Sequence, residues 1–162
     1  MITVRLATMD DAEILARQTM SVQQLHNEAL PFIFKPPSAE LFPPQKLATL
    51  IRDPNSIVAV AMMGDKVVGH IYAAVVSRAE NEFNQAHAYI YIYQIGVDEE
   101  AHRKGAGTEL ISFVRDRARA LGLTTLHVDH WAFNVRAAAF FEACGFSAMK
   151  IVMQRVLKDD AQ

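Results

Sequence analysis

Cysteine is almost absent from this chain of 162 residues, which contains only Cys144. A single cysteine cannot form a disulfide within the chain, and it excludes a zinc site built from several cysteines. Such low cysteine use is typical of proteins in a reducing compartment. We therefore expect a cytoplasmic protein without structural disulfides.

Long apolar runs and an excess of either charge are also missing. No run approaches the roughly 18 residues that a membrane-spanning helix needs. The opening residues, MITVRLATMDD, lack the basic start and apolar core of a signal peptide. The formal net charge is −2, so no global basic field would attract nucleic acid or an anionic membrane. We expect neither a membrane nor a nucleic acid as a partner.

The rest of the composition is that of an ordinary globular domain. Hydrophobic residues make up 51% of the chain and charged residues 21%, which is typical of proteins with a buried core. We find no internal repeat, low-complexity tract or linker-like segment, and the length suits one domain. The sequence predicts a single domain over residues 1–158 and a frayed tail over residues 159–162.

Periodicity and capping residues predict an alternation of strands and helices. The predicted strands cover residues 2–7, 56–63, 66–78, 86–98 and 124–130, with one or two more over 146–157. The predicted helices cover residues 8–30, 44–53, 104–121 and 134–144, the last ending at Gly145. Prolines between residues 31 and 44 predict a loop, and Gly64-Asp65 predicts a type II′ hairpin turn. This order, βααβββαβαβ(β), predicts an α/β or α+β sheet with helices on both faces.

The stretch HRKGAGTEL, residues 102–110, stands at the start of a predicted helix. Free backbone amides and a partial positive charge make such a start suitable for an anion. Gly105 and Gly107 would let an anion approach without meeting a Cβ, while Arg103 and Lys104 add positive charge. These features indicate a phosphate or pyrophosphate site. A glycine-containing turn with solvated cations remains the alternative, because short glycine motifs are weak signals.

Two well-known phosphate motifs do not match this stretch. The nucleoside triphosphate pattern GxxxxGK followed by Ser or Thr is absent, and Leu110 replaces the third glycine of the dinucleotide pattern GxGxxG. We therefore expect neither a nucleoside triphosphate nor NAD as the ligand.

Four segments of the sequence resemble motifs of one enzyme family. HRKGAG resembles the acetyl-CoA-binding motif Q/R-x-x-G-x-G/A of the GCN5-related N-acetyltransferase family, with His102 in place of glutamine or arginine. YQIGVDEEA resembles the fourth strand of that family, which runs into this turn, and VRLATMDDA resembles its first strand and helix. NVRAAAFFEACGF resembles its N-x-x-A-x-x-F-Y-x-x-x-G-F segment. The resemblance spans nearly the whole chain in the expected order.

The resemblance implies a mixed, mostly antiparallel sheet of six to seven strands and a single N-acetyltransferase domain. It implies acetyl-CoA as co-substrate and no metal. The pyrophosphate would lie on backbone amides of the turn, and the pantetheine arm would pair with the fourth strand where strands four and five part. Gly96 fits a β-bulge there, or a glycine that only eases packing. The cofactor-binding residues implied in this way are Ile95, Val97, His102, Arg103, Lys104, Gly105, Ala106, Gly107, Thr108, Asn134 and Phe141.

The resemblance also implies the reaction, which is attack of an amine on the acetyl thioester. A backbone N–H near Val97 is expected to stabilise the developing oxyanion. Family members often carry a tyrosine as general acid where this chain has Phe141. A thiol pKa near 8.5 makes the thiolate a fair leaving group even without that acid. Asn134 resembles the family's asparagine near the pantetheine or the acceptor, although it also suits a plain helix N-cap.

The predicted fourth strand carries the remaining candidate catalytic residues. Period-two alternation places five side chains on one face: Tyr89, Tyr91, Tyr93, Ile95 and Val97. In some relatives a glutamate or histidine faces the acceptor at the positions that align with Tyr91 and Tyr93. Tyrosines are poor bases, so we expect Tyr91 and Tyr93 to orient a water or the amine, unless they form an aromatic face packed on a helix. Candidate outside bases are His26, His70 and His130.

The acceptor is the least defined partner. In the family, the segment between the first two helices, here HNEALPFIFKPPSAELFPP, shapes the acceptor pocket, and Glu28 and Glu40 could attract an amine. We expect a primary amine of a small molecule. The alternatives are a non-catalytic acyl-CoA-binding or sensing module and a protein or peptide N-acetyltransferase. The apolar segment IVMQRVL is compatible with a homodimer, although a buried central strand would show the same pattern.

Overall fold

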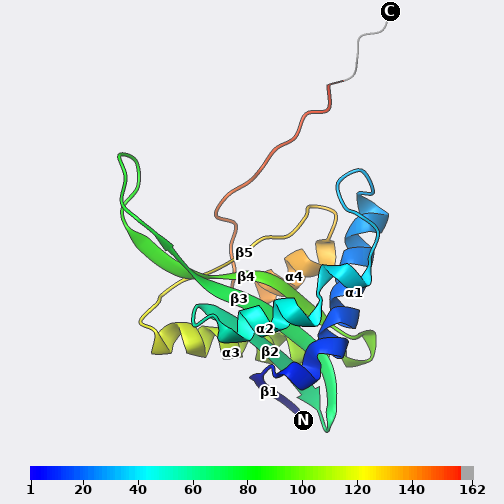
Figure 1. The fold of residues 1–162 in the computed structure, drawn as a ribbon. Helices are drawn as coiled ribbons and strands as arrows, with labels where there is room; N and C mark the ends of the chain where they lie inside the picture. The colour runs from blue at the N-terminus through cyan, green and yellow to red at the C-terminus, as the bar shows by residue number, and fades with distance from the viewer. Residues whose placement is uncertain (158–162) are drawn as a thin grey trace, which may run out of the picture. The chain divides into compact units, whose positions relative to one another are not determined.

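The computed structural model describes residues 1–157 (Figure 1). The predicted tail over residues 159–162 lies outside the described residues. The chain forms two compact units, one over Met1–Asp129 and a second that begins at His130. The first unit holds the whole sheet and three helices, and the second holds one helix. The single domain over residues 1–158 stays a prediction.

The first unit is built on one sheet of five strands. These are β1 (Ile2–Leu6), β2 (Ser56–Met63), β3 (Lys66–Arg78), β4 (His87–Val97) and β5 (Leu126–Val128), in the spatial order β1-β2-β3-β4-β5. All neighbours are antiparallel except β4 and β5, which are parallel and joined through a helix. Short hairpins favour antiparallel pairs, whereas a parallel pair needs a crossover. The predicted mixed, mostly antiparallel sheet with helices is confirmed.

The number of strands is lower than the six to seven predicted. Residues 146–157 form no strand within the described chain, and Ile151, Val152 and Met153 are 78%, 83% and 90% exposed. β5 is three residues long instead of the seven predicted over 124–130. An apolar run becomes a strand only where a neighbouring strand takes its backbone hydrogen bonds, and the side-chain pattern does not report that partner.

The helices follow the predicted order. They are α1 (Ala12–Ala29), α2 (Pro44–Arg52) and α3 (Ala106–Ala120) in the first unit and α4 (Val135–Ala143) in the second. α2 begins at Pro44, whose missing N–H costs nothing in a first turn. Gly122 and Gly145, with φ of +70° and +88°, follow α3 and α4. No helix within residues 1–157 is long and apolar enough to cross a membrane.

Helices cover both faces of the sheet (Figure 1). On one face, Leu15 of α1 and Leu47 of α2 pack with Phe42 against Val58 and Val60 of β2. On the other, α3 contacts β1 to β4 through buried side chains such as those of Leu110 and Val114. A strand whose two faces are both covered needs apolar residues on both, and this explains the uninterrupted burial of residues 57–61 in β2.

Candidate functional site

A β-bulge interrupts β4 at Tyr93. The register between β3 and β4 shifts between Tyr72 and Ala73, which leaves Tyr93 without a partner of its own. An extra residue of this kind inverts the alternation of the side chains beyond it. The prediction that Ile95 and Val97 share one face with the tyrosines is therefore wrong, because it assumed an unbroken period of two.

Gly96 lies beyond the bulge and not within it. It pairs in register with His70 of β3. A Cβ added at Gly96 would come within 2.8 Å of His70 Cε1 and 3.2 Å of Val22 Cγ2 from α1. The glycine is required by close packing of the imidazole ring, so the predicted bulge at Gly96 is wrong and the packing alternative holds.

The second half of β4 has an open edge. In the described sheet, the last pair between β4 and β5 joins Ile92 to Val128, and β4 continues to Val97. The amide of Asp98 donates to a carbonyl of β3 at 2.8 Å. Because backbone groups alternate sides along a strand, the N–H and C=O groups of Ile95 and Val97 face away from β3, toward this open edge. An extended ligand can pair there as an added strand would.

His102 closes one position of the open edge. Its Nε2 atom lies 2.9 Å from the carbonyl oxygen of Val97. A carbonyl only accepts, so Nε2 carries the proton and donates. The side chain that departs from the family motif thus ties the turn to the end of β4 and leaves the N–H of Val97 facing the edge.

The mouth of α3 holds backbone donors that have no partner within the helix. The first hydrogen bond of the helix runs from Glu109 N to Gly105 O at 2.9 Å. The amides of Ala106, Gly107 and Thr108 precede it and have no partner within the helix. Their dipoles add to the partial positive charge of the helix start. These three amides are suited to the oxygens of an anion.

The turn before α3 is shaped by left-handed backbone. Arg103 has φ of +59° and Gly105 has φ of +89°. A Cβ at Gly105 would meet nothing within 4 Å, so the space above the turn is open. The amide of Lys104 donates to Ala101 O at 3.2 Å, so it is the one predicted amide already engaged within the turn. The side chains of Arg103 and Lys104 are exposed, while Ala106 is buried and anchors the helix.

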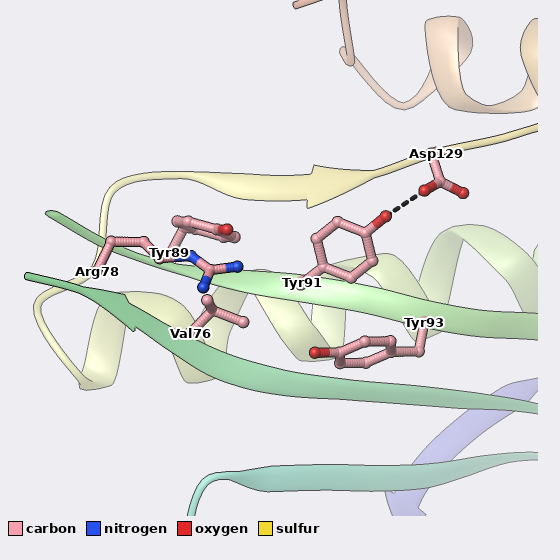
Figure 2. Close-up of a pocket in the computed structure, with 6 residues that line it drawn as sticks. All are labelled: Val76, Arg78, Tyr89, Tyr91, Tyr93 and Asp129. Atoms are coloured by element: carbon pink, nitrogen blue, oxygen red, sulfur yellow. Dashed lines mark hydrogen bonds between the residues drawn. The ribbon is translucent and has the colours of Figure 1, made fainter. Parts of the chain in front are cut away.

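The first half of β4 contributes three tyrosines to an open pocket of about 440 Å³ (Figure 2). The side chains that surround it come from β3, β4 and the residue after β5. They are Val76, Arg78, Tyr89, Tyr91, Tyr93 and Asp129. We refer to this set as the tyrosine pocket.

The rings in and around the tyrosine pocket pack mainly on one another. Tyr93 stacks on Tyr72 of β3 with ring centroids 5.1 Å apart and is tilted against Tyr91 at 4.9 Å. Tyr89 stacks on His127 of β5 at 3.9 Å. Tyr93 stays 54% exposed, so the strand does not present a simple aromatic face buried under a helix.

Tyr91 donates its hydroxyl proton to the carboxylate of Asp129 (Figure 2). Burial raises the pKa of Tyr91, and the hydrogen bond and negative charge of Asp129 raise it further. A phenol with a raised pKa keeps its proton and acts as a donor, so Tyr91 is no base. Its hydroxyl instead fixes the position of a carboxylate at the end of β5.

Asp129 is the functional candidate that the sequence analysis missed. The segment LHVDH could have indicated Asp129 as a site residue, because a carboxylate there directly follows a short apolar strand. Placing it beside Tyr91 requires the parallel pairing of β5 with β4, which sequence alone did not provide. The acidic residues named instead, Glu28 and Glu40, are not among the side chains that line the tyrosine pocket.

The three histidines proposed as bases are not among the side chains that line the tyrosine pocket. His70 is 2% exposed, and its Nδ1 lies 2.9 Å from Gln18 Oε1. Gln18 Nε2 donates to Asp98 Oδ1 at 3.2 Å, which directs Oε1 toward the histidine and makes Nδ1 the donor. Burial lowers the pKa of His70 to about 4, so the ring is neutral and screened from solvent. His26 Nδ1 contacts Val22 O at 2.7 Å, and His130 belongs to the second unit.

The second unit carries two further predicted site residues. Asn134 is the N-cap of α4, where its side-chain oxygen accepts from Ala137 N at 3.1 Å. Phe141 is 5% exposed and packs against the rings of Phe140 and Phe146. The N-cap reading of Asn134 is confirmed, and the cofactor roles of Asn134 and Phe141 stay predictions.

Comparison with known proteins agrees with this geometry. A model of the Acetyltransferase (GNAT) family matches residues 19–146. The BH1408 protein of Bacillus halodurans, as a tetramutant, has a similar structure with a TM-score of 0.89 at 22% identity, covering 96% of this chain and 99% of that one. An aminoglycoside acetyltransferase from an uncultured soil metagenomic sample, in complex with sisomicin, gives a TM-score of 0.67 at 21% identity. That match covers 97% of this chain and 95% of the other.

An aminoglycoside 6′-N-acetyltransferase from Acinetobacter haemolyticus gives a TM-score of 0.71 at 16% identity, covering 98% of this chain and 99% of that one. Identities this low show a shared fold and leave the substrates of this chain undecided. The family model, in contrast, covers the open edge of β4, the mouth of α3 and the start of α4 in one continuous match. The protein therefore belongs to the acetyltransferase (GNAT) family.

Proposed function

We propose that this protein is an acetyl-CoA-dependent N-acetyltransferase that acetylates the primary amine of a small molecule in the cytoplasm. One observation carries the proposal, namely the open edge of β4 over Ile95 and Val97. This edge leads into the mouth of α3 in one direction and into the tyrosine pocket in the other. A co-substrate and an acceptor could therefore meet at the end of β5.

The residues of the turn fit a pyrophosphate. The amides of Ala106, Gly107 and Thr108 would donate hydrogen bonds to its oxygens, and the open space above Gly105 would admit them. Arg103 and Lys104 would add charge from exposed side chains. Together with the open edge, which suits an amide-containing arm, these features support acetyl-CoA as the co-substrate.

The tyrosine pocket fits a positively charged amine. Asp129 supplies a carboxylate, and the faces of Tyr91 and Tyr93 supply aromatic surface that attracts a cation. Acetyl-CoA supplies a thioester carbon, to which the amine nitrogen bonds while the carbon–sulfur bond breaks. The charged amine gives up two protons in all, one to Asp129 or to water before it attacks and one to water as the amide forms, and the thiolate can take a proton back from water. Tyr91 holds the Asp129 carboxylate in place.

The thiolate must leave without a phenol at the usual position, because the chain has Phe141 there. This absence favours a second candidate, a non-catalytic acyl-CoA-binding module. A thiol pKa near 8.5 means that departure without a general acid is chemically accessible, so we prefer the enzyme. The aminoglycoside acetyltransferases among the similar structures support a small amine over a protein or peptide acceptor. A homodimer stays a prediction.

The test is calorimetric titration with acetyl-CoA, followed by thiol release in the presence of a panel of amines that includes aminoglycosides, polyamines and a lysine-containing peptide. We expect binding and amine-dependent thiol release. Binding without thiol release from any amine would support the non-catalytic module. Absence of acetyl-CoA binding would overturn the proposal at its central step.

A further inference from the structure

The tyrosine pocket carries opposite charges at its two ends. Asp129 stands at one end, beside the hydroxyl of Tyr91. Arg78 stands at the other, where its side chain extends along the sheet toward the tyrosine rings (Figure 2). A site for a simple cation would not need a guanidinium, since a like charge repels the ligand.

Arg78 has no partner for its charge in the part of the chain that the structure describes. Its guanidinium takes part in none of the hydrogen bonds or ion pairs found among residues 1–157. A planar guanidinium presents paired donors that match a carboxylate. The charge of Arg78 is thus available to a ligand in the tyrosine pocket.

The reacting amine belongs at the Asp129 end. Asp129 directly follows Val128, which pairs with Ile92 at the point where β5 ends and the open edge of β4 begins. A thioester that lies along this edge would meet an amine held by Asp129. An acidic group on the same molecule would then point toward Arg78, away from the reacting atoms.

The two ends are too far apart for an α-amino acid. Arg78 pairs with His87, and Tyr91 lies four residues further along β4. A strand rises about 3.4 Å per residue, which separates these positions by about 14 Å along the backbone. The arginine side chain covers part of this span, and the rest corresponds to a chain of several carbon atoms.

From this geometry we propose that the acceptor carries a carboxylate separated from its primary amine by several carbon atoms, and that Arg78 is the residue that selects it. This inference rests on the proposed function, because it assigns the Asp129 end to the amine. Arg78 acts in specificity only and takes no part in bond making.

The test compares two acceptors of equal length, ε-aminocaproate and n-hexylamine, which differ in the carboxylate. Calorimetry with wild type should show at least tenfold tighter binding of ε-aminocaproate, and thiol release from acetyl-CoA should show the same preference in kcat/KM. R78Q should remove the preference by weakening ε-aminocaproate alone. R115Q, which removes an exposed arginine of α3 outside the pocket, should retain it.

The two readouts separate the inference from the proposed function. Preferential binding of ε-aminocaproate that depends on Arg78, without thiol release from either amine, would keep the inference and overturn the acetyl transfer. Equal binding of both amines to wild type, or an equal loss of both in R78Q, would overturn the inference whether or not thiol is released. γ-Aminobutyrate, which is shorter by two methylene groups, should bind less tightly than ε-aminocaproate, and tighter binding would contradict the proposed span.

Discussion

The hydroxyl of Tyr91 on β4 donates a hydrogen bond to the carboxylate of Asp129, the residue that follows β5. This contact joins the two strands just where their backbone pairing ends. It replaces backbone hydrogen bonds with a side-chain bond and so keeps a carboxylate fixed at the start of the open edge.

Tyr91→Phe should lower kcat/KM for amine acceptors about tenfold, while acetyl-CoA affinity stays unchanged. The ring remains, but Asp129 loses a charge-assisted hydrogen bond, and such bonds contribute about 1.5–3 kcal/mol. Steady-state thiol release and calorimetry measure the two quantities. Tyr93→Phe is the matched comparison, since the Tyr93 hydroxyl makes no bond to Asp129, and we expect a smaller loss. Wild-type turnover in Tyr91→Phe would assign these tyrosines to packing alone.

Asp129→Asn should raise KM for cationic amines at least tenfold and leave acetyl-CoA binding intact. The amide keeps the size of the side chain and removes its charge, which a buried or partly buried ammonium requires. The effect should shrink when the assay pH exceeds the pKa of the acceptor amine, because a neutral amine does not need the charge. A pH-independent loss would show that Asp129 acts on the fold and not on the acceptor.

Gly105→Val should weaken acetyl-CoA binding at least tenfold, as measured by calorimetry. The side chain would fill the space above the turn and strain a backbone with φ of +89°. Gly122→Val is the control, because Gly122 ends the same helix with φ of +70° and also has nothing near its Cβ position. The control should lose similar stability and keep its affinity. Equal affinities in the two folded variants would contradict an anion site at the mouth of α3.

Asp11→Asn should lower the free energy of unfolding at neutral pH by about 1–2 kcal/mol. We expect the lower end of this range, because the side chain of Arg5 is 44% exposed and solvent screens the ion pair. Asp11 accepts two hydrogen bonds from Arg5, at 2.7 and 2.9 Å, and one from Thr8 N at 2.8 Å. Burial alone would raise the pKa of Asp11, but these bonds outweigh it and the net pKa is lowered.

A lowered pKa in the folded state stabilises the fold above the unfolded pKa of about 3.9 and loses that contribution as the pH falls through the folded value. Urea unfolding from pH 7 to pH 3 should therefore show the Asp11→Asn and wild-type curves converging in acid. A constant difference across this range would assign the loss to packing instead of charge.

His70 should make the free energy of unfolding depend on pH between about pH 4 and pH 6.5, which is a higher range than for Asp11. Burial lowers its pKa to about 4, against about 6.5 in an unfolded chain, so the unfolded state binds more protons between these limits. Stability is complete above about pH 6.5 and falls toward pH 4, by up to about 3 kcal/mol. His70→Gln should flatten the unfolding free energy in this window, and a slope equal to that of wild type would contradict a neutral, buried ring.

Much of the fold could be predicted from local chemistry. The hairpin glycine Gly64, the first-turn Pro44 and the terminal Gly145 each act through their own backbone preferences, and each stands where the sequence indicated. The backbone geometry at residues 102–108 was predictable for the same reason, since it depends on amides and glycines that a motif records directly.

The features that were missed depend on pairing between distant segments. The bulge at Tyr93 arises from the register of β4 against β3, and the residue type at that position does not predict it. Asp129 reaches Tyr91 only because β5 pairs in parallel with β4, and β5 is too short to give a strong pattern. The apolar run over residues 146–157 has the side chains of a strand and no neighbour to make it one.

The close contact between Gly96 and the ring of His70 couples the residues that positions 96 and 70 can accept. Any side chain at position 96 needs a smaller residue at position 70, because a Cβ would lie 2.8 Å from the imidazole. Random mutagenesis of position 96 alone should therefore yield mostly destabilised variants, whereas smaller residues at position 70 alone should meet no clash with Gly96. Paired libraries should recover function in combinations, and homologous sequences should show correlated changes at these two positions.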